Sequence, residues 1–212
     1  MKDIPVFTTE YGIASLILKE IPYREIAYIK IRTVAEGQLP QLVEECVGFC
    51  RAAGAERIFV SGDVDLEAYP YFNSILVMSG PGHFAPEASL WPVTEETVGQ
   101  WRKIYNEKMA AVDNAGTLTA FEEKALAADS GTYFVHDNGQ LLGIGWIKPG
   151  ELVCVASTEA GMGARVVKTL LSAQEEERVQ LEVASTNLRA ISLYEKLGFV
   201  KIRERTRWYR VR

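Results

Sequence analysis

The chain has 212 residues, of which 48% are hydrophobic, and carries a net charge of −5 with a pI near 5.3. This hydrophobic content is enough for a folded core, so the composition excludes a disordered chain, and the acidic balance argues against binding to nucleic acid. No apolar run approaches the roughly 20 residues that a membrane helix needs, and residues 1–5 lack the basic and then apolar layout of a signal peptide. We therefore expect a cytoplasmic protein that binds neither nucleic acid nor membranes.

The cysteines and histidines predict no metal site. Cys46 and Cys50 are four residues apart on one face of a predicted helix, and Cys154 lies inside a predicted strand. Buried thiols that act as small hydrophobes fit a reducing compartment. His83 and His136 are the two histidines, and they form no cluster with the spacing of metal ligands.

The chain divides at a stretch rich in glycine and proline, residues 79–86, which breaks every regular pattern. We predict a first half at 1–80, a linker at 81–87 and a second half at 88–212. The first half contains two credible strands, 14–18 and 26–33, and a long helix that opens after Gly37.

The second half predicts a longer series of elements. They are a strand at 90–93, helices at 95–112 and 118–128 with Thr94 capping the first, and strands at 132–136 and 140–148 around the turn Asp137-Asn138-Gly139. Basic residues that alternate from Lys201 to Arg212 predict the solvent-facing side of a terminal β-hairpin.

A glycine turn follows the next predicted strand, 152–157. Gly161 and Gly163 lead from this strand into a predicted helix at 166–177. Glycines let backbone N–H groups approach a pyrophosphate, and the start of a helix adds partial positive charge there. This arrangement predicts a phosphate-binding loop.

Residues 187–198 predict a short helix between strands at 181–184 and 199–202. Asn187 stands at the N-cap position, and Gly198 stands where a left-handed residue ends a helix. A core-facing stripe at helical spacing explains most of the other positions. It does not explain Tyr194, whose hydroxyl needs a partner or water if it is enclosed.

These residues spell N-x-x-A-x-x-L-Y-x-K-x-G-F, which resembles the acetyl-coenzyme A binding and catalytic segment of the GNAT superfamily of N-acetyltransferases. The glycine turn is similar to the GNAT pyrophosphate loop, which usually reads Q/R-x-x-G-x-G/A, although Thr158 stands where that loop has Arg or Gln. The resemblance implies an α+β mixed-sheet GNAT acyltransferase fold over 88–212. It also implies acetyl-coenzyme A as the cofactor, bound by Val153, Val155, Ala156, Thr158, Gly161, Met162, Gly163, Ala164, Arg165, Asn187, Ala190 and Tyr194.

The resemblance further assigns Tyr194 as the general acid that protonates the departing sulfur, with a backbone N–H near Val155 or Ala156 polarising the thioester carbonyl. The acceptor must attack as a neutral amine, so its proton needs a base. Glu151 at the head of the cofactor strand is our candidate. The alternatives Glu122, Glu123 and His136 stay open.

The first half resembles a second, incomplete GNAT-like unit. Gly37 precedes Gly161 by 124 residues and Asp65 precedes Asn187 by 122, and each pair follows a strand, which indicates a tandem repeat. Leu39 stands at the second loop glycine of this copy, with a proline after it, so we expect a structural partner that binds no cofactor.

Three functions follow as hypotheses. The first is an N-acetyltransferase that acts on a primary amine of a small molecule, an amino acid or a peptide. The second is a catalytically silent module that binds or senses acyl-coenzyme A. The third is an interaction scaffold. The sequence leaves a homodimer open.

Overall fold

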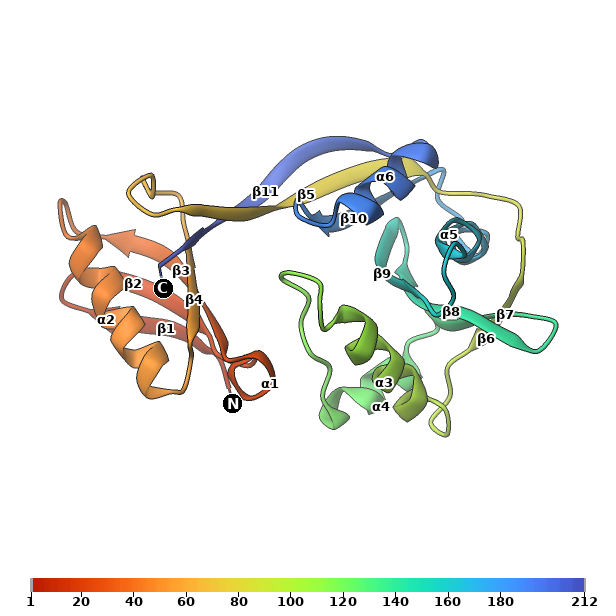
Figure 1. Ribbon diagram of the computed structural model, residues 1–212, viewed down its shortest axis with the longest axis horizontal. Helices are drawn as coiled ribbons and strands as arrows, with labels where there is room; N and C mark the ends of the chain where they lie inside the picture. Colours follow the sequence, from red (N-terminus) through yellow and green to blue (C-terminus); the bar gives the residue numbers. More distant parts are fainter. Residues whose placement is uncertain (1, 212) are drawn as a thin grey trace. The chain divides into compact units, whose positions relative to one another are not determined.

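The computed structural model describes residues 2–211, which form a mixed α/β fold of two compact units (Figure 1). Unit 1 comprises the chain up to Ser74 together with the residues from Arg205 onward. Unit 2 comprises Ile75–Glu204. Each unit is described by itself below.

Unit 1 is a five-stranded mixed sheet with one long helix. Its elements are β1 (Ile4–Thr9), β2 (Gly12–Ile17), α1 (Ile21–Arg24), β3 (Ile26–Val34), α2 (Leu39–Ala52), β4 (Arg57–Ser61) and the end of β11 (Val200–Arg210). The strand order is β1-β2-β3-β4-β11, and β3 and β4 run parallel.

Both faces of the unit 1 sheet are apolar. Helix α2 lies against one face of the sheet (Figure 1). It presents Leu42, Val43 and Cys46 to the face that carries Ala14 and Ile29, and all five residues are buried. The other face holds an aromatic cluster, which comprises Tyr28, Phe59, Phe72 and Trp208, with the rings of Phe59 and Phe72 stacked at 4.3 Å. Aromatic pairs in such offset arrangements add to the stabilisation that burial gives.

Unit 2 is a larger mixed sheet with helices on both faces. Its elements after β5 (Tyr71–Pro81) are β6 (Ser89–Pro92), α3 (Val98–Met109), the 3₁₀ turn η1 (Ala120–Glu122), α4 (Glu123–Ala128), β7 (Thr132–Asp137), β8 (Gln140–Lys148), β9 (Glu151–Ser157), α5 (Gly163–Leu171), β10 (Arg178–Ala184) and α6 (Leu188–Lys196). The strand order is β11-β5-β10-β9-β8-β7-β6, with β9 and β10 parallel.

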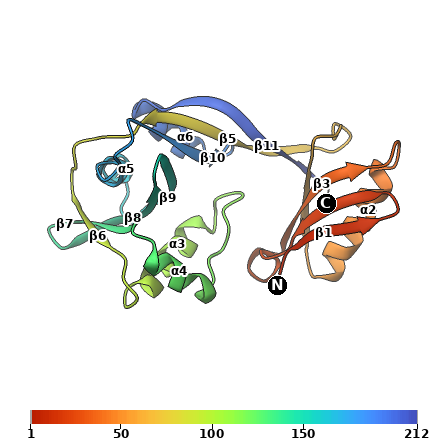
Figure 2. The same cartoon turned by 180° about the vertical axis from the view of Figure 1, so that it is seen from behind.

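The helices of unit 2 divide between the two faces of its sheet. Helices α5 and α6 pack with Leu181 and Val183 of β10 in one apolar cluster, whereas α3 packs with Cys154 and Ala156 of β9 in another. Figure 2 shows α3 and α4 together on one side of β8 and β9, with α5 on the other. Helix α5 approaches β8 so closely that a Cβ on Gly145 would overlap the side chain of Leu170.

Each unit contains a strand from the other half of the sequence. In unit 2, β5 pairs antiparallel with β10 from Ile75 to Pro81, and in unit 1 the end of β11 pairs with β4. The unit boundaries therefore fall inside β5 and β11. The division into domains at 1–80 and 88–212 with a linker at 81–87 stays a prediction. Of residues 81–87, Pro81 ends β5 and the rest lie in the loop before β6.

Most predicted elements of the second half are confirmed, but the predicted terminal hairpin is instead one long strand, β11, which pairs with β5 and β4. Three helices are also shorter than expected. Thr94 and Thr97 bond to one another in a turn, so α3 begins at Val98 rather than at residue 95. A capping box between Thr119 and Glu122 starts η1, so the predicted helix 118–128 begins at Ala120. Helix α5 ends at Leu171 instead of residue 177, because the acidic residues 175–177 would oppose the negative C-terminal end of a longer helix.

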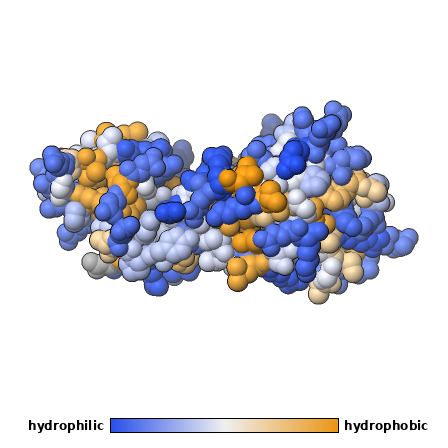
Figure 3. Space-filling view, turned by 90° about the horizontal axis from the view of Figure 1, so that it is seen from above, coloured by the Kyte–Doolittle hydropathy of each residue, from blue (hydrophilic) through white to orange (hydrophobic). Residues whose placement is uncertain are grey.

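In the first half, strand β1 was not predicted, and residues 65–68 form no helix. The space-filling view shows a largely hydrophilic surface with separate apolar patches (Figure 3). Scattered apolar residues of this kind are normal on soluble folds. Within residues 2–211, no helix combines the length and apolarity that crossing a bilayer would require.

Candidate active site

The site begins where two parallel strands part. β9 and β10 each have seven residues, yet they pair only at Glu151 with Gln180 and at Leu152 with Leu181. The register of β9 against β8 shifts at the next residue, Val153. A β-bulge bends the strand that carries it, so it turns β9 away from β10 at this point. Beyond Leu152 the facing edges of both strands are open.

Backbone N–H groups of β9 point into this opening. The N–H of Thr158 donates to the Leu142 carbonyl of β8. In an antiparallel pair the hydrogen-bonded positions alternate, so the N–H groups of Cys154 and Ala156 face β8 too. Those of Val155 and Ser157 then face the gap. Of the two positions predicted from the sequence, the register favours Val155 over Ala156.

The predicted glycine loop joins β9 to α5. Gly161 adopts φ +83°, the left-handed region that glycine enters without strain, and a Cβ there would meet no neighbour within 4 Å. Gly163 is the first residue of α5, so the first N–H groups of this helix have no partner within the helix. Thr158, at the start of the loop, donates its hydroxyl to the Leu141 carbonyl at 2.6 Å.

Helix α6 flanks the same opening. Asn187 is its N-cap, as predicted, and the side-chain oxygen accepts a hydrogen bond from the N–H of Ala190 at 3.2 Å. Gly198 has φ +86° and ends the helix, as predicted. Tyr194 projects from α6, is 7% exposed, and lies 5.8 Å from the ring of Phe199. Within residues 2–211 its hydroxyl has no hydrogen-bond partner, and it is open to the cleft that Tyr194 lines.

These elements enclose a cleft of about 1050 Å³ within unit 2. Most of the predicted cofactor residues line it, namely Val153, Val155, Ala156, Thr158, Gly161, Gly163, Ala164, Asn187, Ala190 and Tyr194. Met162 and Arg165 are not among the lining residues. Met162 packs against the core, and Arg165 pairs with Asp137 at 2.8 Å and donates through Nε to the Glu87 carbonyl at 2.8 Å.

The sequence of unit 2 matches the model of a known protein family. The model of the acetyltransferase (GNAT) family matches residues 98–199, from the start of α3 to the residue after Gly198. Residues 98–199 belong to the GNAT acetyltransferase family. None of the curated proteins matches the chain.

Solved structures share the GNAT fold. A functionally unknown conserved protein from Staphylococcus epidermidis has a TM-score of 0.61 at 11% identity, over 96% of this chain and 91% of its own. A GNAT-family acetyltransferase from Colwellia psychrerythraea has a TM-score of 0.54 at 13% identity, over 98% and 84%. A putative acetyltransferase from Pyrococcus horikoshii has a TM-score of 0.56 at 9% identity, over 93% and 68%. At these identities the likeness concerns the fold.

Two weakly acidic side chains, Tyr194 and Cys154, line the cleft. Burial raises the pKa of Tyr194 well above its ordinary value, and the nearby Cys154 adds to the rise. Burial also raises the pKa of the Cys154 thiol to about 12. The two side chains come from opposite faces of the sheet, and they approach one another because no strand fills the gap between β9 and β10. Both groups are protonated at neutral pH.

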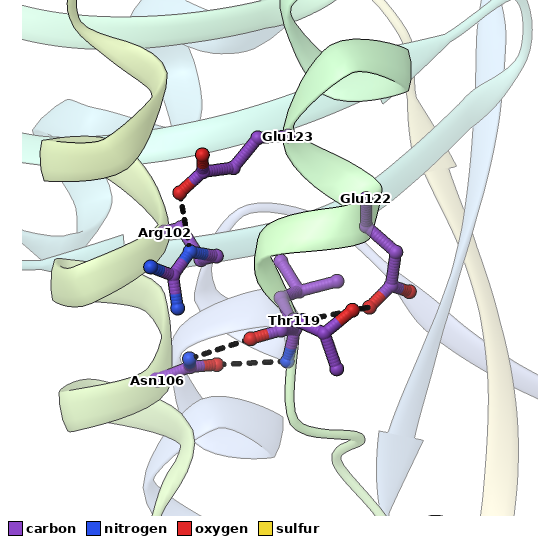
Figure 4. A network of polar contacts seen from close by, with 6 residues as sticks. Arg102, Asn106, Thr119, Glu122 and Glu123 are labelled. Carbon is purple, nitrogen blue, oxygen red and sulfur yellow. Dashed lines mark hydrogen bonds and ion pairs between the residues drawn. The ribbon is translucent and has the colours of Figure 1, made fainter. Parts of the chain in front are cut away.

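None of the carboxylates that we predicted as bases lines the cleft. Glu151 is exposed at the closed end of the gap, where β9 pairs with a strand on each side. Glu123 pairs with Arg102 at 2.6 Å, and Glu122 caps Thr119 (Figure 4). His136 lies on β7 beside the ring of Trp91. The four side chains that the sequence offered as bases therefore all lie outside the cleft.

Three lining residues escaped the sequence analysis. Cys154 was interpreted as a core residue, and Asp113 follows α3 in a segment with no pattern of its own. The Asp113 carboxylate accepts a hydrogen bond from the Thr186 hydroxyl at 2.7 Å, which links this segment to the turn before α6. Glu182 stands on the exposed face of β10, where polar and apolar residues alternate, so its sequence position gave no signal.

Proposed function

We propose that the protein is an acetyl-coenzyme A dependent N-acetyltransferase that acetylates a primary amine of a small molecule, an amino acid or a peptide. The observation that carries this proposal is the opening between β9 and β10, with Tyr194 lining the cleft beside it. A gap in a sheet with open backbone on both sides can accept an extended polar chain as an added strand. The pantetheine arm of coenzyme A is such a chain.

The residues around the gap suit the rest of the acetyl donor. The N-terminus of α5 offers free N–H groups and partial positive charge to a pyrophosphate, and Gly161 leaves the space beside it open. Two cationic side chains of α6, Arg189 and Lys196, also line the cleft and suit phosphate oxygens. Coenzyme A joins a pyrophosphate to an amide chain, so the pyrophosphate would meet the start of α5 while the amide chain lies between β9 and β10.

In the proposed reaction, the Val155 N–H polarises the acetyl carbonyl and stabilises the charge that develops on its oxygen. Tyr194 donates a proton to the departing sulfur. The raised pKa of Tyr194 still suits this role, because the same burial raises the pKa of a thiol at this place, as Cys154 shows with a value of about 12. A phenol and a coenzyme thiol that are buried together therefore stay comparable in acidity.

A silent acyl-coenzyme A module is the second candidate, and Thr158 favours it. This residue stands where the GNAT loop has Arg or Gln, and its N–H and hydroxyl are already bonded to β8. The loop thus lacks the cationic or amide donor that a phosphate would meet there. Turnover separates this candidate from the enzyme.

Calorimetric titration with acetyl-coenzyme A, followed by an assay of thiol release with a panel of primary amines, tests the proposal. We expect one site per chain and amine-dependent release of free coenzyme A. Binding without turnover on any amine would favour the silent module. No binding at concentrations up to the millimolar range would overturn both.

A further inference from the structure

We propose that unit 1 binds an extended peptide, which adds as a strand to the open edge of β1 and places apolar and basic side chains in a groove between β1 and α2. The groove is shallow and has a volume of about 580 Å³. The end of β1 and the turn after it line one side, and one exposed face of α2 lines the other. The site belongs to unit 1, and the proposed acetyl transfer in the cleft of unit 2 does not depend on it.

The outer edge of β1 offers backbone groups to an added strand. β1 comes first in the strand order, and within residues 2–211 no strand other than β2 pairs with it. Thr9 and Gly12 flank a two-residue turn and face one another, so they form the hydrogen-bonded pair that closes the hairpin. Hydrogen-bonded positions alternate along an antiparallel pair, so the N–H and C=O of the exposed Thr8 face away from β2.

The first part of β1 is protected against pairing with another chain, whereas the last part is not. Pro5 has no backbone N–H to donate, and a bulge interrupts the register between Ile4 and Phe7. Both features are common means of keeping an exposed edge from pairing. From Phe7 to Thr9 the pairing with β2 is regular. The unprotected part of the edge is the part that borders the groove.

The α2 side of the groove is apolar and is kept open by a glycine. Phe49 is 39% exposed, and its ring lies 5.2 Å from that of Phe7. Gly48 stands beside it in the interior of α2, where glycine weakens a helix. A Cβ on Gly48 would meet no atom within 4 Å, so no close contact within the chain requires glycine. Its absent side chain leaves space next to the Phe49 ring.

Two carboxylates give the groove a negative charge. Glu10 and Glu45 are exposed and line it, and within residues 2–211 neither forms an ion pair. Both lie near one hydroxyl, because a hydrogen bond with Glu10, the charge of Glu10 and the charge of Glu45 all raise the pKa of Tyr11. Charge complementarity therefore favours a peptide with a lysine or arginine. An apolar residue two positions away points to the same face of an extended strand and would meet Phe49.

Fluorescence anisotropy of labelled synthetic peptides with the full-length protein tests the proposal. The probe is the peptide Thr-Leu-Thr-Lys-Thr-Leu-Thr, and its control has glutamate in place of the lysine. We expect saturable binding of the probe and an affinity for the control that is lower by roughly tenfold or more, because attraction to two carboxylates becomes repulsion. Two further probes are methylated on alternate backbone nitrogens. Only the set that faces β1 should lose affinity, since strand pairing uses every second N–H.

Matched variants locate the site. Glu45→Lys should weaken binding of the probe by roughly tenfold or more, whereas Glu44→Lys, the same change at an exposed neighbour outside the groove, should keep the parental affinity. Gly48→Leu should abolish binding, because the new side chain fills the open space beside Phe49. Leucine favours a helix over glycine, so the midpoint of thermal unfolding should not fall.

The outcomes distinguish the occupants of the groove. No binding of the probe up to the millimolar range, equal affinities for the lysine and glutamate peptides, or parental affinity in Gly48→Leu would overturn the proposal. Equal effects of both methylation patterns would overturn strand addition. A dimer of the parent in sedimentation velocity that Gly48→Leu abolishes and the probe does not displace would assign the groove to a second copy of the chain instead.

Discussion

The two units of this protein share one run of elements, but the parallel strands of that run part only in unit 2. In each, a strand is followed by a left-handed glycine, a helix and a parallel strand, as β3, Gly37, α2 and β4 in unit 1 and as β9, Gly161, α5 and β10 in unit 2. The two glycines have φ angles of +70° and +83°. A glycine turn before a helix is therefore not sufficient for a cofactor site.

The pairing of the parallel strands accounts for the difference. β3 and β4 pair at five consecutive residues, from Ile26 to Lys30, and leave no gap between them. β9 and β10 pair at two. Strands β3 and β9 each have a register shift against their antiparallel neighbour, at Arg32 in β3 and at Val153 in β9. In both strands the parallel pairing ends just before this shift. The bulge is at the seventh residue of β3 but at the third residue of β9, and the earlier bulge exposes the backbone that an acyl donor would meet.

The segment after the second strand differs as well. In unit 2 the capped helix α6 follows and brings Tyr194 to the gap. In unit 1 the Asp65 side chain accepts a hydrogen bond from the N–H of Glu67 at 3.0 Å, which makes a turn and no helix. The predicted match between residues 65–68 and 187–190 fails for this reason. Unit 1 has no counterpart of Tyr194 in its described residues.

The largest effect that we expect comes from dividing the chain. A chain of residues 88–212 lacks the strand from Ile75 to Pro81, which pairs with β10 along seven residues and covers its edge. An uncovered edge with buried side chains on one face aggregates readily. We expect 88–212 to show no cooperative thermal transition and 71–212 to regain one, as measured by circular dichroism. A cooperative transition of equal midpoint in both would show that β5 is dispensable for unit 2.

Tyr194→Phe should have the next largest effect. The variant keeps the ring beside Phe199 but removes the hydroxyl that faces the cleft. We expect turnover to fall by roughly 10²–10⁴-fold with the affinity for acetyl-coenzyme A nearly unchanged. Single-turnover rates corrected for the folded fraction measure this. A Phe variant within threefold of the parent would falsify the general-acid role.

A charge placed at the start of each helix tests the comparison of the two glycine loops. Ala164, the second residue of α5, lines the cleft, and Ala164→Glu would repel a pyrophosphate there. The same charge favours the N-terminal end of a helix, so the fold should not lose stability. We expect at least a tenfold loss of affinity for acetyl-coenzyme A by calorimetry, or about 1.4 kcal/mol.

The matched control is Gln41→Glu, in the first turn of α2 in unit 1. It should leave the affinity unchanged, because β3 and β4 offer no gap to the donor. Equal losses of affinity in Ala164→Glu and Gln41→Glu would mean that both loops bind phosphate. Equal affinities in the parent and both variants would show that α5 does not bind the pyrophosphate.

The sequence predicted the parts of the site that depend on local chemistry. Asn187 and Gly198 have fixed places at the ends of a helix, and Gly161 has a fixed place in the loop, so a single sequence reveals them. The two ends of the gap could not be told apart in this way. Glu151 and Glu182 both lie on the strands that border the gap, and only the register between β9 and β10 shows that one stands at the closed end and the other where the strands part.

The fold was predictable to a similar extent. Strands and turns of the second half follow from alternation and from the Asp137-Asn138-Gly139 hairpin signal. The exchange of β5 and β11 between the two halves did not follow, because strand order depends on pairing between residues more than 100 positions apart in the sequence, such as Ile75 with Ala184. The repeat in the sequence suggested an incomplete first half and a complete second half, with no strand shared between them.

The smallest expected effect concerns the cysteines, which provide one probe in the cleft of unit 2 and two in the core of unit 1. Burial raises the pKa of Cys154 to about 12 and those of Cys46 and Cys50 to about 12 and about 11. The thiolate is the reactive form, so all three should react slowly with iodoacetamide at neutral pH. Since the folded pKa of Cys154 lies above the ordinary value of 9, the rate of its alkylation should keep rising about tenfold per pH unit beyond pH 9, where an exposed thiol reaches its plateau.

Saturating acetyl-coenzyme A should slow the alkylation of Cys154 and leave Cys46 and Cys50 unaffected, as followed by mass spectrometry of the digested protein. A plateau for Cys154 near pH 9 would contradict the buried environment, and equal protection of all three cysteines would show that the donor acts on the whole chain rather than by covering the gap between β9 and β10.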